Sequence, residues 1–212
     1  MKRGLFIVFE GIDGCGKSTQ VWRLGKHLSN LSKYNHIVMT REPWKDTKIR
    51  KMLRESEDPY SNAVELAKMY VEDRKEHIKE LIMPELMKGA HVISDRYSLS
   101  TLAYQQTQGI PLKKLVEMHR GLPIPDIIFI VDIPAKVALE RMQKDTTRDK
   151  KKEHKFEKDV KFIEKLRKIF LKLPEQLGNH NIFVIDGTKS VEDNFQNQIK
   201  PVFDKFYNSK YN

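Results

Sequence analysis

A glycine-rich stretch near the start of the chain, "GIDGCGKST" beginning at Gly11, contains the residue types that bind phosphates. It fits the pattern G-x-x-x-x-G-K-[ST], in which glycines allow backbone N–H groups to face an anion. Lys17 is then placed to reach the β- and γ-phosphates, and the Ser18 hydroxyl to ligate Mg²⁺. The stretch predicts an ATP site formed by Gly11, Gly14, Cys15, Gly16, Lys17, Ser18 and Thr19.

A second candidate stretch is "DRYSLSTLAYQ", which runs from Asp95 to Gln105. Asp95 closes an apolar run, and ligands of doubly wound sheets bind at the carboxyl ends of the strands. Its carboxylate is therefore a candidate Mg²⁺ ligand together with Ser18. The planar guanidinium of Arg96 is suited to gripping a phosphate. The alternative is an Asp–Arg pair on the surface at a strand end.

Two further segments supply cations and an aromatic ring. Tyr70, Arg74 and His77 in "MYVEDRKEH" are spaced so that they share one helical face. A ring and an arginine one turn apart can stack on a base and bond its edge. The spacing alone is nevertheless more typical of an ordinary amphipathic helix. Arg41 in "TREP" follows a predicted strand and adds a cation at the same sheet edge.

Cys15 occupies a variable position of the glycine-rich pattern. Its nearness to Lys17 and to a helix N-terminus are features that lower the pKa of a thiol. Phosphoryl transfer needs no thiol, so we interpret Cys15 as a small residue that fits the loop.

Apolar runs and helical patterns alternate along the chain and predict the elements that position these residues. The apolar runs are Leu5–Phe9, 36–40, 91–95, 126–132 and 181–186. Runs without strict alternation are typical of parallel strands that helices cover on both faces. The pattern predicts a three-layer α/β/α, doubly wound fold with a five-stranded parallel sheet. Because no repeat or linker interrupts it, we expect residues 1–212 to form a single domain.

The intervening segments are predicted to be helical, with identifiable caps and breaks. Residues 61–88 form one long helical pattern that Pro84 should kink or shorten. Ser190 is a candidate N-cap, with Asp193 three residues later. Pro201 should bend the last helix.

The composition limits the class of protein. The net charge of +10, from 39 basic and 29 acidic residues, fits an anionic partner such as a nucleotide or a lysine-rich surface kept soluble by charge. No run approaches the roughly 18 apolar residues of a membrane span, and the first residues do not form a signal peptide. One cysteine agrees with a reducing compartment, so we expect a cytoplasmic location and no membrane partner.

Taken together, these motifs resemble the thymidylate kinase family over nearly the whole chain. "FEGIDGCGKSTQ", "TREP" and "DRYSLSTLAYQ" resemble the family's phosphate loop and acceptor segments. "GLPIPDIIFIVDIPAKVALER" and "IDGTKSVED" resemble its later strand junctions. The resemblance implies a P-loop nucleoside-monophosphate kinase fold, a homodimer, and the Mg²⁺-dependent reaction ATP + dTMP → ADP + dTDP in dTTP biosynthesis.

The resemblance also assigns roles by position. Asp13 would contact the deoxyribose of the acceptor nucleotide and Arg96 its phosphate, with Arg41 close by. Tyr70 stands where the family usually has a phenylalanine that stacks on thymine, which puts a hydroxyl in the pocket wall. The dTMP-binding residues implied are Asp13, Arg41, Tyr70, Arg74, Arg96, Ser100, Tyr104 and Gln105.

A polar segment at about residues 141–155 is predicted to be a lid over ATP, with seven basic and three acidic residues. Some family members place an arginine directly after the loop aspartate, where this chain has Gly14. The lid would then supply the cation for the transition state, with Arg148 and Arg141 the leading candidates and Lys155 next. The implied catalytic residues are Lys17, Asp13, Arg96, Arg148 and Arg141.

Other functions remain open at this stage. The first alternative is a kinase for another deoxynucleoside monophosphate or for a nucleoside. A nucleoside acceptor would need a carboxylate base, and Arg96 would lose its phosphate partner. A second alternative is a P-loop protein stimulated by nucleic acid. It lacks support because the chain has no aromatic-interleaved basic strand and no recognition helix, so we expect no nucleic-acid partner.

Overall fold

The computed structural model describes residues 2–45, 47–55, 62–145, 160–178 and 181–211. The predicted lid cations Arg148 and Lys155, and most of the predicted lid, lie outside the described residues. Arg141 lies inside them, near the end of a helix. The single-domain organisation of residues 1–212 stays a prediction.

Five parallel strands form one sheet, as predicted. The strands are β1 Phe6–Glu10, β2 Ile37–Arg41, β3 His91–Asp95, β4 Ile127–Asp132 and β5 Ile182–Asp186. Their order is β2-β3-β1-β4-β5, with β1 paired to β3 on one side and to β4 on the other. The predicted bounds agree to within one residue. The strand order brings the carboxyl ends of β1, β2 and β3 together at one edge, where the phosphate loop begins.

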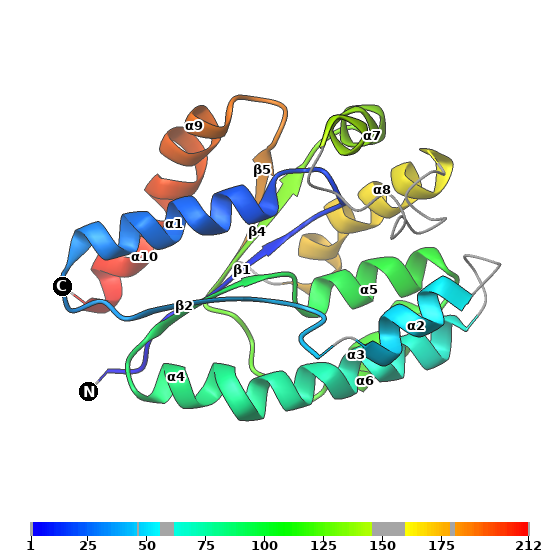
Figure 1. Cartoon of the computed structure of the whole chain (residues 1–212), viewed down its shortest axis with the longest axis horizontal. Coiled ribbons are helices and arrows are strands. Elements are labelled where there is room, and N and C mark those ends of the chain that lie inside the picture. Colours follow the sequence, from blue (N-terminus) through cyan, green and yellow to red (C-terminus); the bar gives the residue numbers. More distant parts are fainter. Residues whose placement is uncertain (1, 46, 56–61, 146–159, 179–180, 212) are drawn as a thin grey trace.

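The described helices cover both faces of the sheet (Figure 1). They are α1 Lys17–Leu31, α2 Thr47–Glu55, α3 Ala63–His77, α4 Met83–Met87, α5 Ser98–Thr107, α6 Leu112–Met118, α7 Ala135–Lys144, α8 Val160–Leu177, α9 Val191–Asn194 and α10 Lys200–Tyr211. Helices α1, α9 and α10 lie on one side of the strands, and α3, α4 and α5 on the other (Figure 1). The predicted three-layer α/β/α fold is confirmed.

Both predicted breaks at prolines are present as widened helical turns. A π-helical segment, Ile78–Ile82, precedes Pro84, and a second, Phe195–Ile199, precedes Pro201. The backbone N–H of the residue before each proline bonds the carbonyl five residues earlier, rather than four. Since proline has no N–H and clashes with the carbonyl four residues before it, the wider turn removes the conflict. The chain therefore continues as a helix past each proline.

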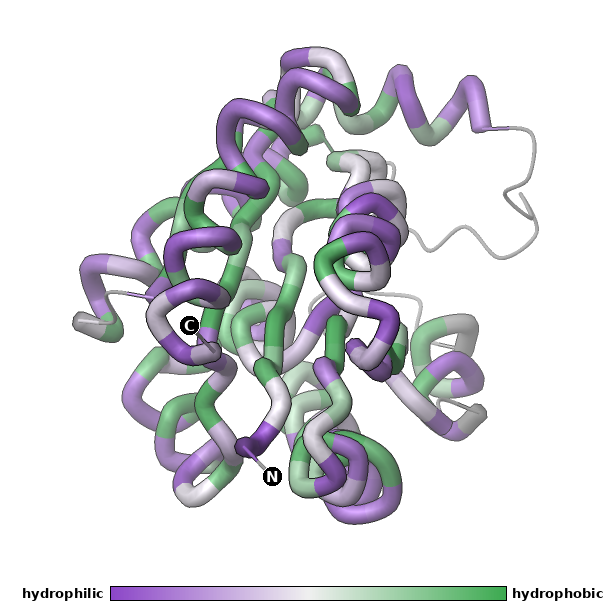
Figure 2. Tube along the Cα trace, turned by 90° about the vertical axis from the view of Figure 1, so that its left-hand side faces the viewer, coloured by the Kyte–Doolittle hydropathy of each residue, from purple (hydrophilic) through white to green (hydrophobic). Residues whose placement is uncertain are grey.

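The core lies between the sheet and the two helical layers. Strands β1 and β3 are buried along their whole length, and Figure 2 shows hydrophobic strands enclosed by helices with mixed faces. The predicted cap is also present, since the Ser190 hydroxyl accepts a hydrogen bond from the Asp193 N–H at 3.1 Å. At the far end from the phosphate loop, the Tyr211 hydroxyl donates to the Arg3 carbonyl at 2.9 Å and ties the two ends of the chain together.

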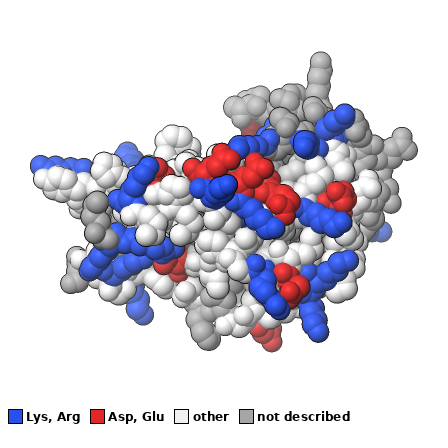
Figure 3. All heavy atoms as spheres, turned by 90° about the horizontal axis from the view of Figure 1, so that it is seen from below, with Lys and Arg blue, Asp and Glu red and all other residues white. Residues whose placement is uncertain are grey.

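The surface carries both signs of charge. On the face seen in Figure 3, basic and acidic side chains lie side by side across its middle. Short-range pairs such as Lys75–Glu72 and Lys88–Glu85 contribute to this mixing. Within the described residues, no helix is long and apolar enough to cross a membrane.

Candidate active site

The glycine-rich loop joins β1 to the N-terminus of α1 at the carboxyl edge of the sheet. Lys17 is buried, and its ammonium donates hydrogen bonds to the carbonyl oxygens of Gly11 at 3.0 Å and Ile12 at 2.8 Å. The positive end of the fifteen-residue helix α1 points into the same loop. A buried ammonium and a helix N-terminus together make this loop suited to an anion.

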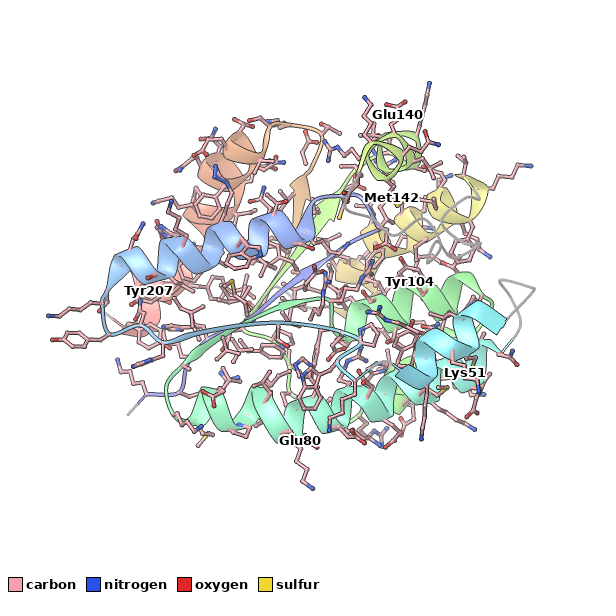
Figure 4. The ribbon with its side chains drawn as sticks, viewed as in Figure 1. Lys51, Glu80, Tyr104, Glu140, Met142 and Tyr207 are labelled. Atoms are coloured by element: carbon pink, nitrogen blue, oxygen red, sulfur yellow. The ribbon has the colours of Figure 1, made fainter. Side chains whose placement is uncertain are left out.

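Helix α7 packs directly against the loop at Gly14. The backbone φ of Gly14 is +77°, and a Cβ placed there would lie 2.7 Å from the Ala138 carbonyl oxygen. Figure 4 labels Met142, one turn further along α7, whose Cγ would lie 3.0 Å from the same Cβ. No side chain fits at this position without moving α7. The loop therefore offers no cation after Asp13, as the sequence indicates.

We expect Gly14→Ala to be more destabilising than the matched substitution Gly109→Ala. Both glycines have a positive φ, but a Cβ at Gly109 meets no atom of the described residues within 4 Å. Backbone strain alone should cost about 1–2 kcal/mol at Gly109, and strain plus overpacking about 3 kcal/mol at Gly14. Urea unfolding of both variants measures the difference. Equal losses would show that α7 does not restrict the loop.

Cys15 is unsuited to chemistry in this structure. Its side chain is 2% exposed, and burial raises the pKa of the thiol against the opposing effect of Lys17. The pKa-lowering effect of Lys17 and the helix N-terminus considered from the sequence is thus outweighed by desolvation. The interpretation of Cys15 as a small residue that fits the loop agrees with this burial.

Ser18 and Asp95 meet at the edge of the loop. The Ser18 hydroxyl donates to the Asp95 carboxylate at 2.5 Å, and an Arg41 Nη2 donates to the same carboxylate oxygen at 3.2 Å. Burial acts to raise the pKa of Asp95, but Lys17, Arg96 and the Ser18 hydrogen bond hold it below its usual value. A cavity of about 540 Å³ opens beside these side chains. The Ser18 hydroxyl and the anionic Asp95 carboxylate therefore both line this cavity.

Arg96 pairs with the phosphate loop and not with its neighbour in sequence. Its guanidinium donates to Asp13 at 2.6 Å, to the Ser100 hydroxyl at 2.9 Å and to the Tyr104 hydroxyl at 3.4 Å. The Tyr104 hydroxyl, labelled in Figure 4, in turn donates to Asp13 at 3.1 Å. The surface Asp–Arg pair considered as an alternative is wrong, because Asp95 faces Ser18 and Arg41 instead. Three residues predicted to bind the acceptor nucleotide thus surround Arg96.

A buried carboxylate that the sequence reading missed supports this group. Glu10, fully buried at the end of β1, accepts hydrogen bonds from the backbone N–H groups of Tyr97 and Ser100 and from the Ser100 hydroxyl. Burial raises the pKa of Glu10 to about 7, against the opposing hydrogen bonds and Arg96. Because Ser100 also receives Arg96, Glu10 connects β1 to the arginine. The sequence does contain an indication of this role, because Glu10 is a charged residue directly after an apolar run.

Two of the predicted base-binding residues, Tyr70 and Gln105, have buried polar groups. Burial raises the pKa of the Tyr70 hydroxyl to about 12, and Arg96, Asp13 and Arg74 all act on it electrostatically. Gln105 is 2% exposed, and its Oε1 has no hydrogen-bond partner among the described residues. A buried acceptor without a partner in the described chain is suited to a polar ligand.

His77 does not belong to this group, although it shares a helix with Tyr70. Its ring is fully buried and lies 2.9 Å from the Thr40 hydroxyl and 3.1 Å from a Glu42 carboxylate oxygen. Trp44 stacks on the same ring. His77, which the sequence does not assign to the site, faces strand β2 and the turn after it.

Arg141 lies on α7 and donates to the Gly187 carbonyl at 3.0 Å. The carboxylates that end β4 and β5 pair within the protein. Asp132 pairs with Arg167 at 2.7 Å, and Asp186 accepts from the N–H and hydroxyl of Thr188. Thr19, predicted to belong to the ATP site, is exposed and lies in the first turn of α1.

Comparison with known proteins identifies the family. The family model described as thymidylate kinase matches residues 9–199. The chain belongs to the thymidylate kinase family. A thymidylate kinase of Thermosipho africanus is 37% identical over 213 residues, covering 97% of this chain and 100% of the relative. One of Wolbachia pipientis wMel is 38% identical over 201 residues, covering 90% and 94%. A probable thymidylate kinase of Thermococcus kodakarensis is 36% identical over 198 residues, covering 89% and 92%.

Membership of the thymidylate kinase family confirms the resemblance, but the structure adds residues that the motifs did not single out. Besides Glu10, these are Glu42 and His119, which both contact Arg74. Glu42 stands in the "TREP" segment, where only its neighbouring arginine attracted attention. His119 lies in a segment with no motif signal, so only the folded arrangement of α3 and α6 could reveal it.

Proposed function

We propose that the protein is a dTMP kinase that catalyses ATP + dTMP → ADP + dTDP. The observation that carries this function is the contact of Asp13, within the phosphate loop, with Arg96 and Tyr104 from the β3–α5 segment. That contact joins a triphosphate-binding loop directly to an acceptor pocket. Family membership and the names of the relatives support the same activity.

The pocket offers a donor and an acceptor that match the thymine edge. Thymine presents O4, an acceptor, beside N3–H, a donor. Arg74 supplies N–H donors, and the Gln105 Oε1 is a buried acceptor without a partner in the described chain. The Gln105 amide is held in this orientation because its Nε2 donates to Gln108 Oε1 at 3.0 Å. The Tyr70 ring provides a face on which the base stacks.

The chemical step needs cations and positioning more than a base. The second pKa of a phosphate monoester is near 6, so the attacking oxygen of dTMP is largely ionised at pH 7. That oxygen attacks the γ-phosphorus of ATP, the bond to the β–γ bridging oxygen breaks, and ADP departs. Lys17 and Arg96 approach the reacting phosphates from the donor and acceptor sides. Arg141, with Arg148 from the predicted lid, is proposed to neutralise charge on the transferring group.

The oxygen pair of Ser18 and Asp95 fits Mg²⁺. This ion prefers oxygen ligands, and it is commonly held by one or two protein groups together with substrate phosphates. The 2.5 Å contact shows that hydroxyl and carboxylate already point toward one another, next to the cavity. Ser18 and Asp95 would hold the ion, which would neutralise negative charge on the ATP phosphates.

Two wider expectations belong to the same proposal. A homodimer is proposed from membership of the thymidylate kinase family. The cysteine is buried and unpaired, as suits a reducing cytoplasm. The reaction involves no nucleic acid and no membrane.

A direct test is an ADP-release assay with ATP, Mg²⁺ and each of the four common deoxynucleoside monophosphates. We expect the highest kcat/KM with dTMP. The matched Arg74 and Gln105 groups should disfavour dCMP, whose edge has the opposite order of donor and acceptor. A higher kcat/KM with another monophosphate, or turnover with nucleosides alone, would contradict the proposal.

A further inference from the structure

The guanidinium of Arg74 is buried and makes several hydrogen bonds within the protein. The side chain is 1% exposed. Its Nε donates to Glu42 Oε2 at 2.8 Å, and Nη2 lies 2.6 Å from the same oxygen. Nη2 also donates to the Tyr97 carbonyl at 2.8 Å and to the Thr101 hydroxyl at 3.2 Å. These contacts occupy one edge of the guanidinium.

His119 occupies part of the remaining edge. An Arg74 Nη1 lies 2.7 Å from His119 Nε2, while His119 Nδ1 lies 2.7 Å from the Leu115 carbonyl. Because the carbonyl can only accept, Nδ1 carries the proton and Nε2 accepts from Arg74. Burial, followed by the nearby Arg74, lowers the pKa of His119 to about 4, so the ring is neutral around pH 7. The tautomer is therefore fixed by its two partners.

A count of the five Arg74 N–H groups shows what is left for a ligand. Glu42, Tyr97 and Thr101 receive the Nε–H and both Nη2 hydrogens, and His119 receives one Nη1 hydrogen. A single Nη1–H has no partner among the described residues. Gln105, with its unpaired Oε1, lies one turn beyond Thr101 on α5. One donor and one acceptor thus remain in this pocket.

We propose that His119 is a positioning residue: by accepting one Nη1–H of Arg74, it leaves a single Nη1 donor for the pyrimidine edge and so selects thymine over cytosine. The inference rests on the proposed dTMP kinase activity. A fixed N–H faces O4 of thymine productively but meets the N4 amino donor of cytosine. Without His119, both Nη1 hydrogens lack this partner, and the arginine offers a second donor that can serve an acceptor such as N3 of cytosine. Glu42, Tyr97 and Thr101 hold the guanidinium in place, whereas His119 limits the donors that face the base.

The test compares three substitutions of His119 for dTMP and dCMP. His119→Asn keeps an amide N–H that reaches the Leu115 carbonyl but removes the acceptor at the Nε2 position. His119→Gln places an oxygen near that position, and His119→Phe removes both groups. Arg120→Gln is the control, since the neighbouring Arg120 side chain is 78% exposed and pairs with Glu117 within the described part of the chain. Each variant is also checked by thermal unfolding.

We expect His119→Asn and His119→Phe to lower the ratio of kcat/KM for dTMP to that for dCMP by about ten- to a hundredfold. His119→Gln should retain most of the ratio, and Arg120→Gln all of it. An unchanged ratio in folded His119→Asn, or equal losses with both substrates, would overturn the inference. If the wild-type protein did not prefer dTMP at all, the proposed function would fail first, so the two failures are distinguishable.

Discussion

Lys17→Ala should reduce phosphoryl transfer from ATP to dTMP by about 10³-fold. The side chain is the one cation built into the centre of the loop, within 3.0 Å of two loop carbonyls. A phosphate bound there offers its oxygens to the ammonium in place of those carbonyls. The loss should appear in kcat as well as in KM, because negative charge on the β–γ bridging oxygen increases as that bond breaks. A coupled ADP-release assay at saturating ATP measures it.

Two further variants separate this role from a structural one. Lys17→Met retains most of the apolar stem and removes only the charge, so it should lose as much activity as Lys17→Ala while unfolding near the wild-type temperature. Lys26→Ala, an exposed lysine on the same helix, should have wild-type activity. Near-normal turnover in either folded Lys17 variant would refute the mechanism.

The fold could be predicted from the sequence because its signals are local. Each buried strand is a short apolar run, and each run is separated from the next by a helical pattern long enough for a parallel crossover. The predicted ends of β1 and β2 were each one residue short, because Glu10 and Arg41 continue the strand with charged side chains. In both cases backbone pairing outweighed the polarity of the residue.

The candidate site could be predicted only where one segment carries the chemistry. Asp13, Lys17 and Ser18 share one loop, so their proximity follows from spacing. The partners of Arg74 come from three separate segments, because Glu42 follows β2, Tyr97 precedes α5 and His119 ends α6. No periodicity in the sequence reports such a contact. Side chains that position a ligand-binding residue are therefore the part that needs the structure.

The same distinction applies to His77. Its spacing from Arg74 predicts a shared helical face, and both residues do contact Glu42. The shared face points toward β2 and the turn after it, not into the ligand pocket. Spacing identifies which residues lie together, but the packing of the helix decides what they lie against. Arg74 reaches the pocket because its side chain is long enough to extend past Glu42 toward Tyr97 and His119.

Arg96→Gln is the second change expected to have a large effect, a loss of about 10²–10³-fold in kcat/KM for dTMP. The guanidinium lies 2.6 Å from Asp13 and is steadied by Ser100 and Tyr104. Burial disfavours its charge, but Asp13 and the other anionic neighbours together raise its pKa above the usual value. Removing it takes away the cation that faces the dTMP phosphate. It also removes the guanidinium from the Asp13 carboxylate in front of that dianion, while the Tyr104 hydrogen bond to Asp13 remains.

A double substitution distinguishes these two contributions. Asp13→Asn in the Arg96→Gln background removes the carboxylate charge, so it should recover thermal stability and lower the KM for dTMP, while kcat stays low because no cation has been restored. Arg41→Gln, which removes an exposed cation paired with Asp95, should cost less than Arg96→Gln in the same assay. Recovery of kcat in the double variant would show that Arg96 acts only by neutralising Asp13. Ser100 accepts from Arg96 and donates to Glu10, so the guanidinium is held in place independently of Asp13. We therefore expect catalysis to require the positive charge of Arg96 and not only the neutralisation of Asp13.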